Sequence, residues 1–295
     1  MSRPPTFVPP ACATARTLRT ARGDFAVLDA VPDGGVAGRG TVLLLPGFTG
    51  SKEDFIALLE PLTRAGYRAV TVDGRGQYET AGPDDESAYA QGELARDVLA
   101  QAEALTGEPG AGPRLHLLGH SLGGQIARAA LLVDPRPFAT LTLMSSGPAA
   151  ITPAQQARAT MLADALAVLS MDEVWQAMQA MEPPPPQEAA TGADGDADDA
   201  EALRARWLKH SPAQLTATGR QLSTEPDRVA ELAALPLPKH VVSGERDDTW
   251  PLPLLDDMAV RLRAHRTVIP GAEHSPNTDR PATTAAALID FWDRH

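Results

Sequence analysis

The fold is decided by one stretch of the sequence, Leu115-His116-Leu117-Leu118-Gly119-His120-Ser121-Leu122-Gly123-Gly124. Its first four residues predict a short buried strand, and the apolar spacing over 126–132 predicts a helix directly behind it. Between them, Gly-x-Ser-x-Gly is typical of a sharp strand-to-helix turn that exposes the serine at the end of a sheet. In a chain with 24 glycines this pattern also arises by chance. The alternative is that Ser121 has no chemical role and merely lies in a glycine-rich turn. The strand before the motif and the helix after it favour the interpretation of Ser121 as a nucleophile.

Strands and helices alternate on both sides of this stretch. Strands are expected at 41–45, 68–72, 115–118, 140–144, 240–242 and 266–269, and helices at 53–65, 93–105, 125–133, 253–264 and 282–293. A hairpin over 17–31 precedes them and adds an antiparallel edge. The alternation predicts an α/β fold with a mostly parallel central sheet flanked by helices.

One long segment, residues 149–235, interrupts the alternation with helical patterns at 153–169, 171–181 and 201–210. Within it, four prolines are followed by an acidic stretch without aromatic residues, which is a signature of disorder. We expect a helical cap inserted over the sheet. The expected organisation is a flexible arm at 1–15, a core at 16–148 and 236–295, and a cap at 149–235 with a disordered acidic loop at about 183–200.

Composition excludes several classes of protein. The formal net charge of -12, without clustered Lys and Arg, argues against binding to nucleic acid. No run of about 18 apolar residues predicts a transmembrane helix, and the proline-rich beginning lacks the apolar core of a signal peptide. A single cysteine, Cys12, permits neither an intramolecular disulfide nor a cysteine metal cluster. We expect a cytoplasmic protein without membrane contact that acts on a small molecule, and the sequence leaves its oligomeric state open.

A nucleophilic serine needs two backbone N–H groups aimed at the oxyanion that forms during attack on a carbonyl. One N–H belongs to the residue after the nucleophile, here Leu122. The other comes from the loop after an earlier central strand, where Pro46-Gly47 precedes Phe48. We therefore expect Phe48 and Leu122 to form the oxyanion hole. The alternative for Phe48 is an ordinary turn between strand and helix.

The base must reach Ser121 from a loop at the carboxyl edge of the sheet. Of the seven histidines, only His274 directly follows the last expected strand in such a loop. The acid lies between serine and histidine in the chain order of this fold. Asp247 is selected from an acidic turn after a strand, with Asp248 in reserve and Glu245 third. The alternative is a solvated acidic loop.

With these motifs, the chain resembles bacterial members of the α/β-hydrolase superfamily. The nucleophile motif holds Ser121, a Gly-x-x-Asp-x-x-x-Pro stretch runs from Gly244 to Pro251 around Asp247, and a Gly-x-x-His loop ends at His274. The oxyanion loop of the family usually reads His-Gly, whereas this chain has Pro46-Gly47, which keeps the glycine and the backbone donor. The resemblance covers about residues 15–148 and 236–295.

The resemblance implies transfer of an acyl group to water through Ser121, without a metal or an organic cofactor. Esters, thioesters and lactones all suit this machinery. Met144, Trp175 and Trp250 are candidates for lining the substrate pocket, together with Met161, Met171, Met178 and Trp207, although packing in the core explains most of them equally well. Four cations of the cap either receive a carboxylate of the substrate or form a solvated helix face: Arg204, Arg206, Lys209 and Arg220.

Two other functions remain open. The string Gly47-Phe48-Thr49-Gly50-Ser51 resembles the oxyanion loop of the menaquinone-pathway synthase of this fold, a carbon–carbon lyase that eliminates pyruvate. In that family an arginine commonly follows the glycines of the nucleophile turn, but here Gln125 does. A non-catalytic receptor for a small molecule is the other alternative, and the complete set of serine, acid and histidine argues against it.

Overall fold

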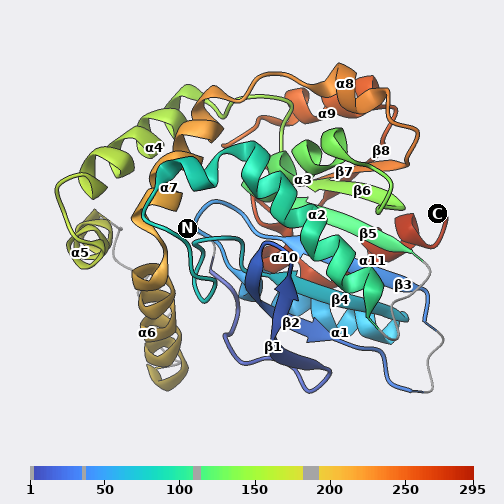
Figure 1. Ribbon diagram of the computed structural model, residues 1–295, viewed down its shortest axis with the longest axis horizontal. Coiled ribbons are helices and arrows are strands. Elements are labelled where there is room, and N and C mark those ends of the chain that lie inside the picture. Colours follow the sequence, from blue (N-terminus) through green and yellow to red (C-terminus); the bar gives the residue numbers. More distant parts are fainter. Residues whose placement is uncertain (1–2, 35–37, 109–113, 182–192) are drawn as a thin grey trace.

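The computed structural model describes residues 3–34, 38–108, 114–181 and 193–295. Its strands are β1 (Ala13–Thr20), β2 (Gly23–Ala30), β3 (Gly40–Leu45), β4 (Tyr67–Val72), β5 (Leu115–His120), β6 (Thr140–Met144), β7 (Lys239–Gly244) and β8 (His265–Ile269). They form one sheet in the order β1-β2-β4-β3-β5-β6-β7-β8 (Figure 1). Strands β3 to β8 are parallel, and the β1–β2 hairpin pairs antiparallel with β4, which confirms the fold class predicted from the sequence.

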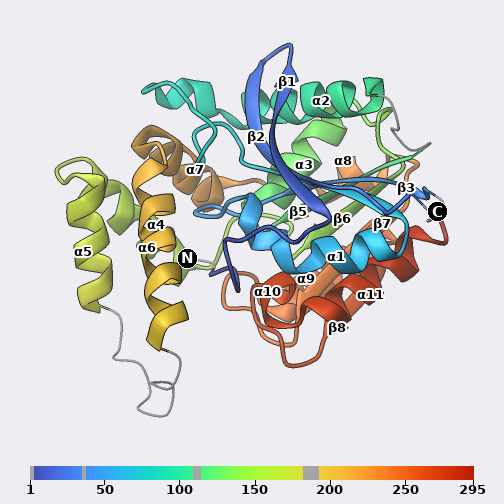
Figure 2. The same cartoon turned by 90° about the horizontal axis from the view of Figure 1, so that it is seen from below.

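The central strands β3, β5, β6 and β7 are buried along their whole length. Helices cover both faces of a parallel sheet, so these strands carry apolar residues on both sides: β3 is almost entirely apolar, whereas β5, β6 and β7 also bury polar residues such as His116, Thr142 and His240. The elements that flank the sheet are η1 (Lys52–Phe55), α1 (Ile56–Arg64), η2 (Glu86–Tyr89), α2 (Gln91–Gly107), α3 (Leu122–Val133), α9 (Leu252–Leu262), α10 (Pro276–Asp279) and α11 (Pro281–Trp292). Figure 2 shows α2 and α3 on one side of the sheet and α1 and α11 on the other.

Among the described residues between β6 and β7 lie the helices α4 (Pro153–Leu166), α5 (Met171–Met181), α6 (Ala193–Lys209), α7 (Pro212–Thr224) and α8 (Val229–Ala233). Helices α4 to α7 stand beside the sheet, at the left of Figure 1. Helix α8 instead contacts α3 and α9, and its Val229 and Leu232 belong to the main core. The inserted cap is therefore built from α4 to α7.

The acidic segment of the cap differs in part from the expectation of a disordered loop. Helix α6 begins at Ala193, where the sequence predicts a loop to about residue 200 and a helix only from 201. Residues 182–192 of the expected loop lie outside the described residues.

The cap has an apolar cluster of its own, which includes Trp175 and Trp207. Phe7, from the segment expected to be a flexible arm, packs against this cluster. The guanidinium of Arg206 lies 5.8 Å from the centre of the Phe7 ring. Phe48, from the loop after β3, contacts both this cluster and the main core. The chain before β1 and the loop after β3 therefore meet the cap at the same cluster.

Candidate active site

Ser121 lies between the last residue of β5 and the first residue of α3, with backbone angles of φ 53 and ψ -118. These angles are strained for a residue with a side chain, and they project the serine out of the turn. A Cβ on Gly119 would lie 2.2 Å from the carbonyl oxygen of Gly123, and one on Gly123 would lie 2.4 Å from that of Leu45. Both positions of the motif therefore require glycine because the backbones touch. The Ser121 N–H donates to the carbonyl of Met144 at 2.9 Å and ties the turn to β6.

The structure brings Ser121, His274 and Asp247 into one hydrogen-bonded chain. Ser121 Oγ lies 3.1 Å from His274 Nε2, and His274 Nδ1 lies 3.0 Å from both carboxylate oxygens of Asp247. An ionised carboxylate only accepts hydrogen bonds, so Nδ1 carries the hydrogen and Nε2 is left to accept the serine proton. The Asp247 side chain is fully buried, whereas the His274 side chain is 27% exposed. Ser121 is itself only 6% exposed, so of the three side chains that of His274 is the most accessible to solvent.

Two other carboxylates were candidates for the acid, and both point elsewhere. Asp248 accepts from Gln155 at 2.7 Å, and its side chain is 69% exposed. Glu245 accepts from the backbone N–H of Gly271 at 2.9 Å. Asp247 Oδ1 also accepts the N–H groups of residues 249 and 250, which fixes its carboxylate against His274.

The loop after β3 passes directly beside Ser121. A Cβ placed on Gly47 would lie 3.3 Å from the Ser121 Cβ. Over the described ranges of the chain, the N–H groups of Phe48 and Leu122 have no protein acceptor. Both groups therefore keep their hydrogen-bonding capacity for an oxygen atom from outside the protein.

Just beyond this loop, η1 is fixed to the end of β4 by a buried lysine. The Lys52 N–H donates to one oxygen of the Asp73 carboxylate at 2.7 Å, and Lys52 Nζ donates to the other at 2.8 Å. Lys52 Nζ also donates to Glu79 at 2.7 Å. Charge-assisted hydrogen bonds of this kind hold the segment after the loop in one position.

His120 is a site residue that the sequence reasoning missed, because the neighbour of a nucleophile is expected to point away from it. Its Nε2 donates to the backbone carbonyl of His274 at 2.8 Å, and its ring lies 5.2 Å from that of His274. Burial lowers the pKa of His120 to about 4, so the ring is neutral near pH 7 and carries a single N–H. His120 thereby ties the loop that carries His274 to the turn that carries Ser121. Its position next to the serine motif is the only sequence signal for this role.

The expected substrate-lining residues occupy three different surroundings. The Trp250 ring stacks along His274, with centroids 6.2 Å apart, and its Nε1–H donates to the carbonyl of Ala149 at 2.9 Å. Met144 is fully buried in the core between the sheet and α1. Trp175 belongs to the apolar cluster of the cap. The Trp250 side chain thus lies against His274, whereas Met144 meets Ser121 through its backbone carbonyl.

The cations of the cap are engaged with carboxylates of the protein. Arg206 pairs with Asp54 at 2.7 Å, and both side chains are fully buried. The other pairs are more exposed: Arg204 with Asp172 at 2.6 Å, Arg220 with Glu86 at 2.8 Å and Lys209 with Glu79 at 3.9 Å. Arg206 therefore links the cap to η1, the segment that follows the loop after β3.

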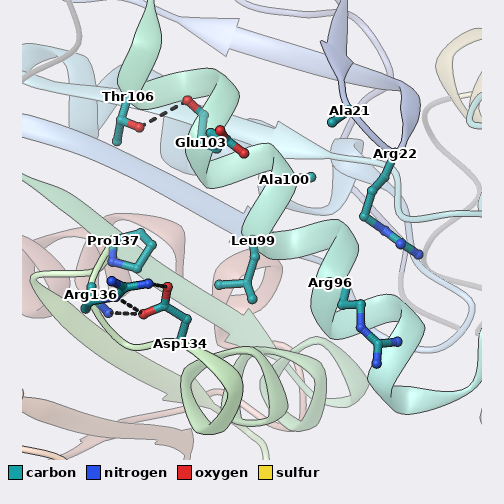
Figure 3. A pocket seen from close by; sticks show the side chains of 10 residues that line it. All are labelled: Ala21, Arg22, Arg96, Leu99, Ala100, Glu103, Thr106, Asp134, Arg136 and Pro137. Atoms are coloured by element: carbon teal, nitrogen blue, oxygen red, sulfur yellow. Dashed lines mark hydrogen bonds and ion pairs between the residues drawn. The ribbon is translucent and has the colours of Figure 1, made fainter.

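A surface groove of about 620 Å³ lies away from these residues, between the β1–β2 turn, α2 and the loop after α3 (Figure 3). Three arginines are among the residues that line it. Arg22 pairs with Glu93 and Asp97, Arg96 also pairs with Glu93, and Arg136 pairs with Asp134. The groove contains none of the candidate site residues, so its volume alone does not make it the candidate active site.

Comparison with known proteins identifies the family. Residues 42–287 match the model of the alpha/beta hydrolase family. This chain is an alpha/beta hydrolase. It is 30% identical over 272 residues to the pimeloyl-[acyl-carrier protein] methyl ester esterase of Edwardsiella ictaluri, which covers 87% of this chain and 95% of that protein.

Two further relatives of this alpha/beta hydrolase bear on its fold and its chemistry. The structure of a thermophilic esterase from Thermogutta terrifontis matches 96% of this chain and 99% of its own, with a TM-score of 0.72 and 21% identity, which shows the shared fold. The 2-succinyl-6-hydroxy-2,4-cyclohexadiene-1-carboxylate synthase of an Enterobacter species is 39% identical over 79 residues. That match covers 27% of this alpha/beta hydrolase and 28% of the synthase. Over the described residues, no helix has the length and apolar character to span a membrane.

Proposed function

We propose that this alpha/beta hydrolase cleaves a carboxylic ester, thioester or lactone of a small to medium substrate through an acyl-enzyme on Ser121. The observation that carries the proposal is the hydrogen-bonded chain Ser121–His274–Asp247 beside two backbone N–H groups without a protein acceptor. The similarity over most of its length to an enzyme named as a methyl ester esterase supports an ester as the substrate.

In the first half of the proposed reaction, His274 Nε2 takes the proton of Ser121 while Oγ forms a bond to the carbonyl carbon. The electron pair of the carbonyl moves to its oxygen, where the N–H groups of Phe48 and Leu122 stabilise the negative charge. When the carbonyl re-forms, the bond to the leaving group breaks, and His274 gives its proton to the departing oxygen or sulfur. The acyl group is then bound to Ser121.

In the second half, a water molecule replaces the leaving group. His274 takes a proton from the water, and the water oxygen bonds to the acyl carbon. The bond to Ser121 Oγ breaks, Oγ regains the proton from His274, and the free acid departs. Asp247 stays ionised throughout, fixes the tautomer of His274 and stabilises its protonated form.

The test is the Ser121→Ala variant, assayed on a panel of p-nitrophenyl esters of graded chain length. Turnover of the preferred ester should fall by about 10³-fold or more, because alanine removes the nucleophile but little packing. Ser146→Ala is the matched control, since Ser146 is also buried and its side chain packs against Gly124 of the same turn. A fluorophosphonate should label the control but not Ser121→Ala. Near-normal turnover by Ser121→Ala would refute the proposal.

The partial match to the synthase favours a carbon–carbon lyase as the second candidate. An ester hydrolase and a lyase of this kind differ in the covalent intermediate. A rapidly quenched reaction of the hydrolase with its ester should leave an acyl group on Ser121, visible as a mass increase of the intact protein. A substrate turned over without any such adduct, and without ester hydrolysis, would favour the lyase. Absence of both turnover and labelling would favour the receptor.

A further inference from the structure

A side-chain amide fixes the loop after β3 from the side of β4. Gln77 lies in the turn that follows β4 and is only 5% exposed. Its Nε2 donates to the carbonyl oxygen of Gly47 at 2.8 Å, and its Oε1 accepts the N–H of Gly74 at 3.0 Å. The carbonyl of Gly47 is an acceptor and the N–H of Gly74 is a donor, so the amide fits in one orientation only.

This contact acts on the peptide bond that carries the N–H of Phe48. The bond between Gly47 and Phe48 is planar and trans, as are all peptide bonds in the described residues. In a trans peptide the C=O and the N–H point in opposite directions. The C=O of Gly47 accepts from Gln77 and also from the N–H of Gly50, at 3.2 Å. By holding this C=O, Gln77 helps to set the direction of the Phe48 N–H, which has no acceptor among the described residues.

The turn that carries Gln77 is strained and closely braced. Its neighbours Gly76 and Tyr78 both have positive φ, at 72° and 38°, and Tyr78 does so despite its side chain. The Gln77 N–H donates to the carbonyl of Gly74 at 2.9 Å, and Thr80 Oγ1 donates to that of Asp73 at 2.8 Å. Strained backbone of this kind persists where the surrounding structure imposes it, and it gathers at functional sites.

We propose that Gln77 is a positioning residue for the oxyanion hole. It holds the Gly47–Phe48 peptide so that the Phe48 N–H meets the oxyanion, and it acts through Phe48 without touching the substrate. This assignment rests on the function proposed above. The hydrogen bond should therefore contribute more to the transition state, where the negative charge develops, than to binding of the neutral ester.

The experiment compares Gln77→Leu with a matched control, Gln221→Leu. Gln221 also donates from Nε2 to a backbone carbonyl, that of Tyr89 at 2.5 Å, but at a site outside the oxyanion loop. Loss of a donor from an oxyanion hole lowers kcat by about 10²-fold to 10³-fold. Gln77→Leu misdirects a donor without removing it, so we expect kcat to fall between about 10-fold and 100-fold with KM within about 3-fold. The control should keep kcat within about 3-fold of the wild type.

A trifluoromethyl ketone separates a positioning role from a merely structural one. It forms an adduct with Ser121 that carries an oxyanion, so its inhibition constant should rise in Gln77→Leu by about the factor by which kcat falls. Gln77→His should restore most of the activity, because histidine Nε2 is four bonds from the Cα, as glutamine Nε2 is. If Gln77→Leu fails to fold, Gln77→Glu keeps the size but puts an oxygen against the Gly47 carbonyl, and it should lose kcat while Gln77→His does not.

Several outcomes would overturn the assignment. They are an unchanged kcat in both Gln77→Leu and Gln77→Glu, a loss confined to KM, an unchanged inhibition constant, or an equal loss in Gln221→Leu. Ser121→Ala is measured in parallel. If it is inactive while the Gln77 variants are normal, only the role of Gln77 fails. If Ser121→Ala keeps its turnover, the proposed function fails, and the role of Gln77 falls with it.

Discussion

At the scale of single residues, Asp247 and Asp248 are adjacent in the chain but have opposite surroundings. The Asp247 carboxylate is fully buried and accepts from His274 and two backbone N–H groups. The Asp248 carboxylate lies in solvent beside Gln155 and Arg158. Successive side chains point in different directions, so only one of the two carboxylates can face His274.

These surroundings predict very different effects for the same substitution. Asp247→Asn should lower turnover by roughly 10⁴-fold, because the amide favours the wrong tautomer of His274. Asp248→Asn should change turnover by less than about tenfold, since it alters only a solvated contact. Turnover of both variants on one ester is the measurement, with circular dichroism to check folding. Greater damage in Asp248→Asn would contradict the role assigned to Asp247.

The sequence indicates the residues that we propose to react more clearly than the residues that we propose to position them. Ser121, Asp247 and His274 were selected by motif, chain order and loop position, and the structure brings these three into hydrogen-bond contact. Gln77 and His120 act on backbone carbonyls 30 and 154 residues away. Such a contact leaves no local pattern, because a backbone carbonyl is present at every position.

At the scale of elements, a buried ion pair joins the cap to the core. Arg206 of α6 and Asp54 of η1 are both inaccessible to solvent, and Arg206 also donates to Ser51 Oγ at 3.3 Å. From the sequence, Arg206 fitted either a solvated face or a receptor for a substrate carboxylate. Its burial against Asp54 gives it a different role, that of fixing α6 beside the oxyanion loop.

The ion pair predicts that Arg206→Met destabilises the protein strongly. Methionine leaves the Asp54 carboxylate buried without this partner, a change that costs about 3–5 kcal/mol in comparable pairs. The melting temperature should fall by about 10 °C. Arg204→Met is the control on the same helix, because Arg204 pairs with Asp172 in solvent, and it should shift the melting temperature by less than about 2 °C. Equal shifts in the two variants would show that burial of the Arg206–Asp54 pair contributes no stability.

The polarity of the buried residues explains which elements the sequence predicts well. The central strands are predictable because burial on both faces favours short apolar stretches, such as Val42 to Leu45 in β3. Helix α7 was not singled out, because its buried face includes Gln214, Thr218 and Gly219. Gln214 Nε2 donates to Thr218 Oγ1 within the helix at 3.1 Å, so part of the buried face of α7 is polar and the helix lacks a continuous apolar stripe.

At the scale of the whole molecule, several histidines are buried in uncharged form. Burial lowers the pKa of His116 and His120 to about 4 and that of His240 to about 3, against 6.5 for the free side chain. The unfolded chain therefore takes up protons between pH 6.5 and about 4 that the folded chain does not bind. The stability associated with these groups is complete above pH 6.5 and is lost as the pH falls toward 4.

The buried histidines predict that the free energy of unfolding decreases steeply in acid. Each such histidine should lower the free energy of unfolding by about 1 kcal/mol per pH unit within that window. His240→Gln removes one titrating group that lies in β7, away from Ser121. The drop in melting temperature between pH 7 and pH 5 should therefore be smaller in His240→Gln than in the wild type. An equal or larger drop would show that His240 does not contribute to the acid sensitivity.

The place at which the cap enters and leaves the sheet bears on how this enzyme can diversify. Strands β6 and β7 are parallel neighbours: the chain leaves β6 at Met144 and re-enters the sheet at Lys239, which pairs with Leu141, so both ends of the insertion are fixed points of one sheet. Doubling the length of a segment between fixed ends costs only about 0.6 kcal/mol in chain entropy. Evolution can therefore lengthen, shorten or exchange the cap while the strands that hold Ser121, Asp247 and His274 stay in register. Relatives of this protein can therefore acquire new substrate specificities through the cap while these three residues keep their positions.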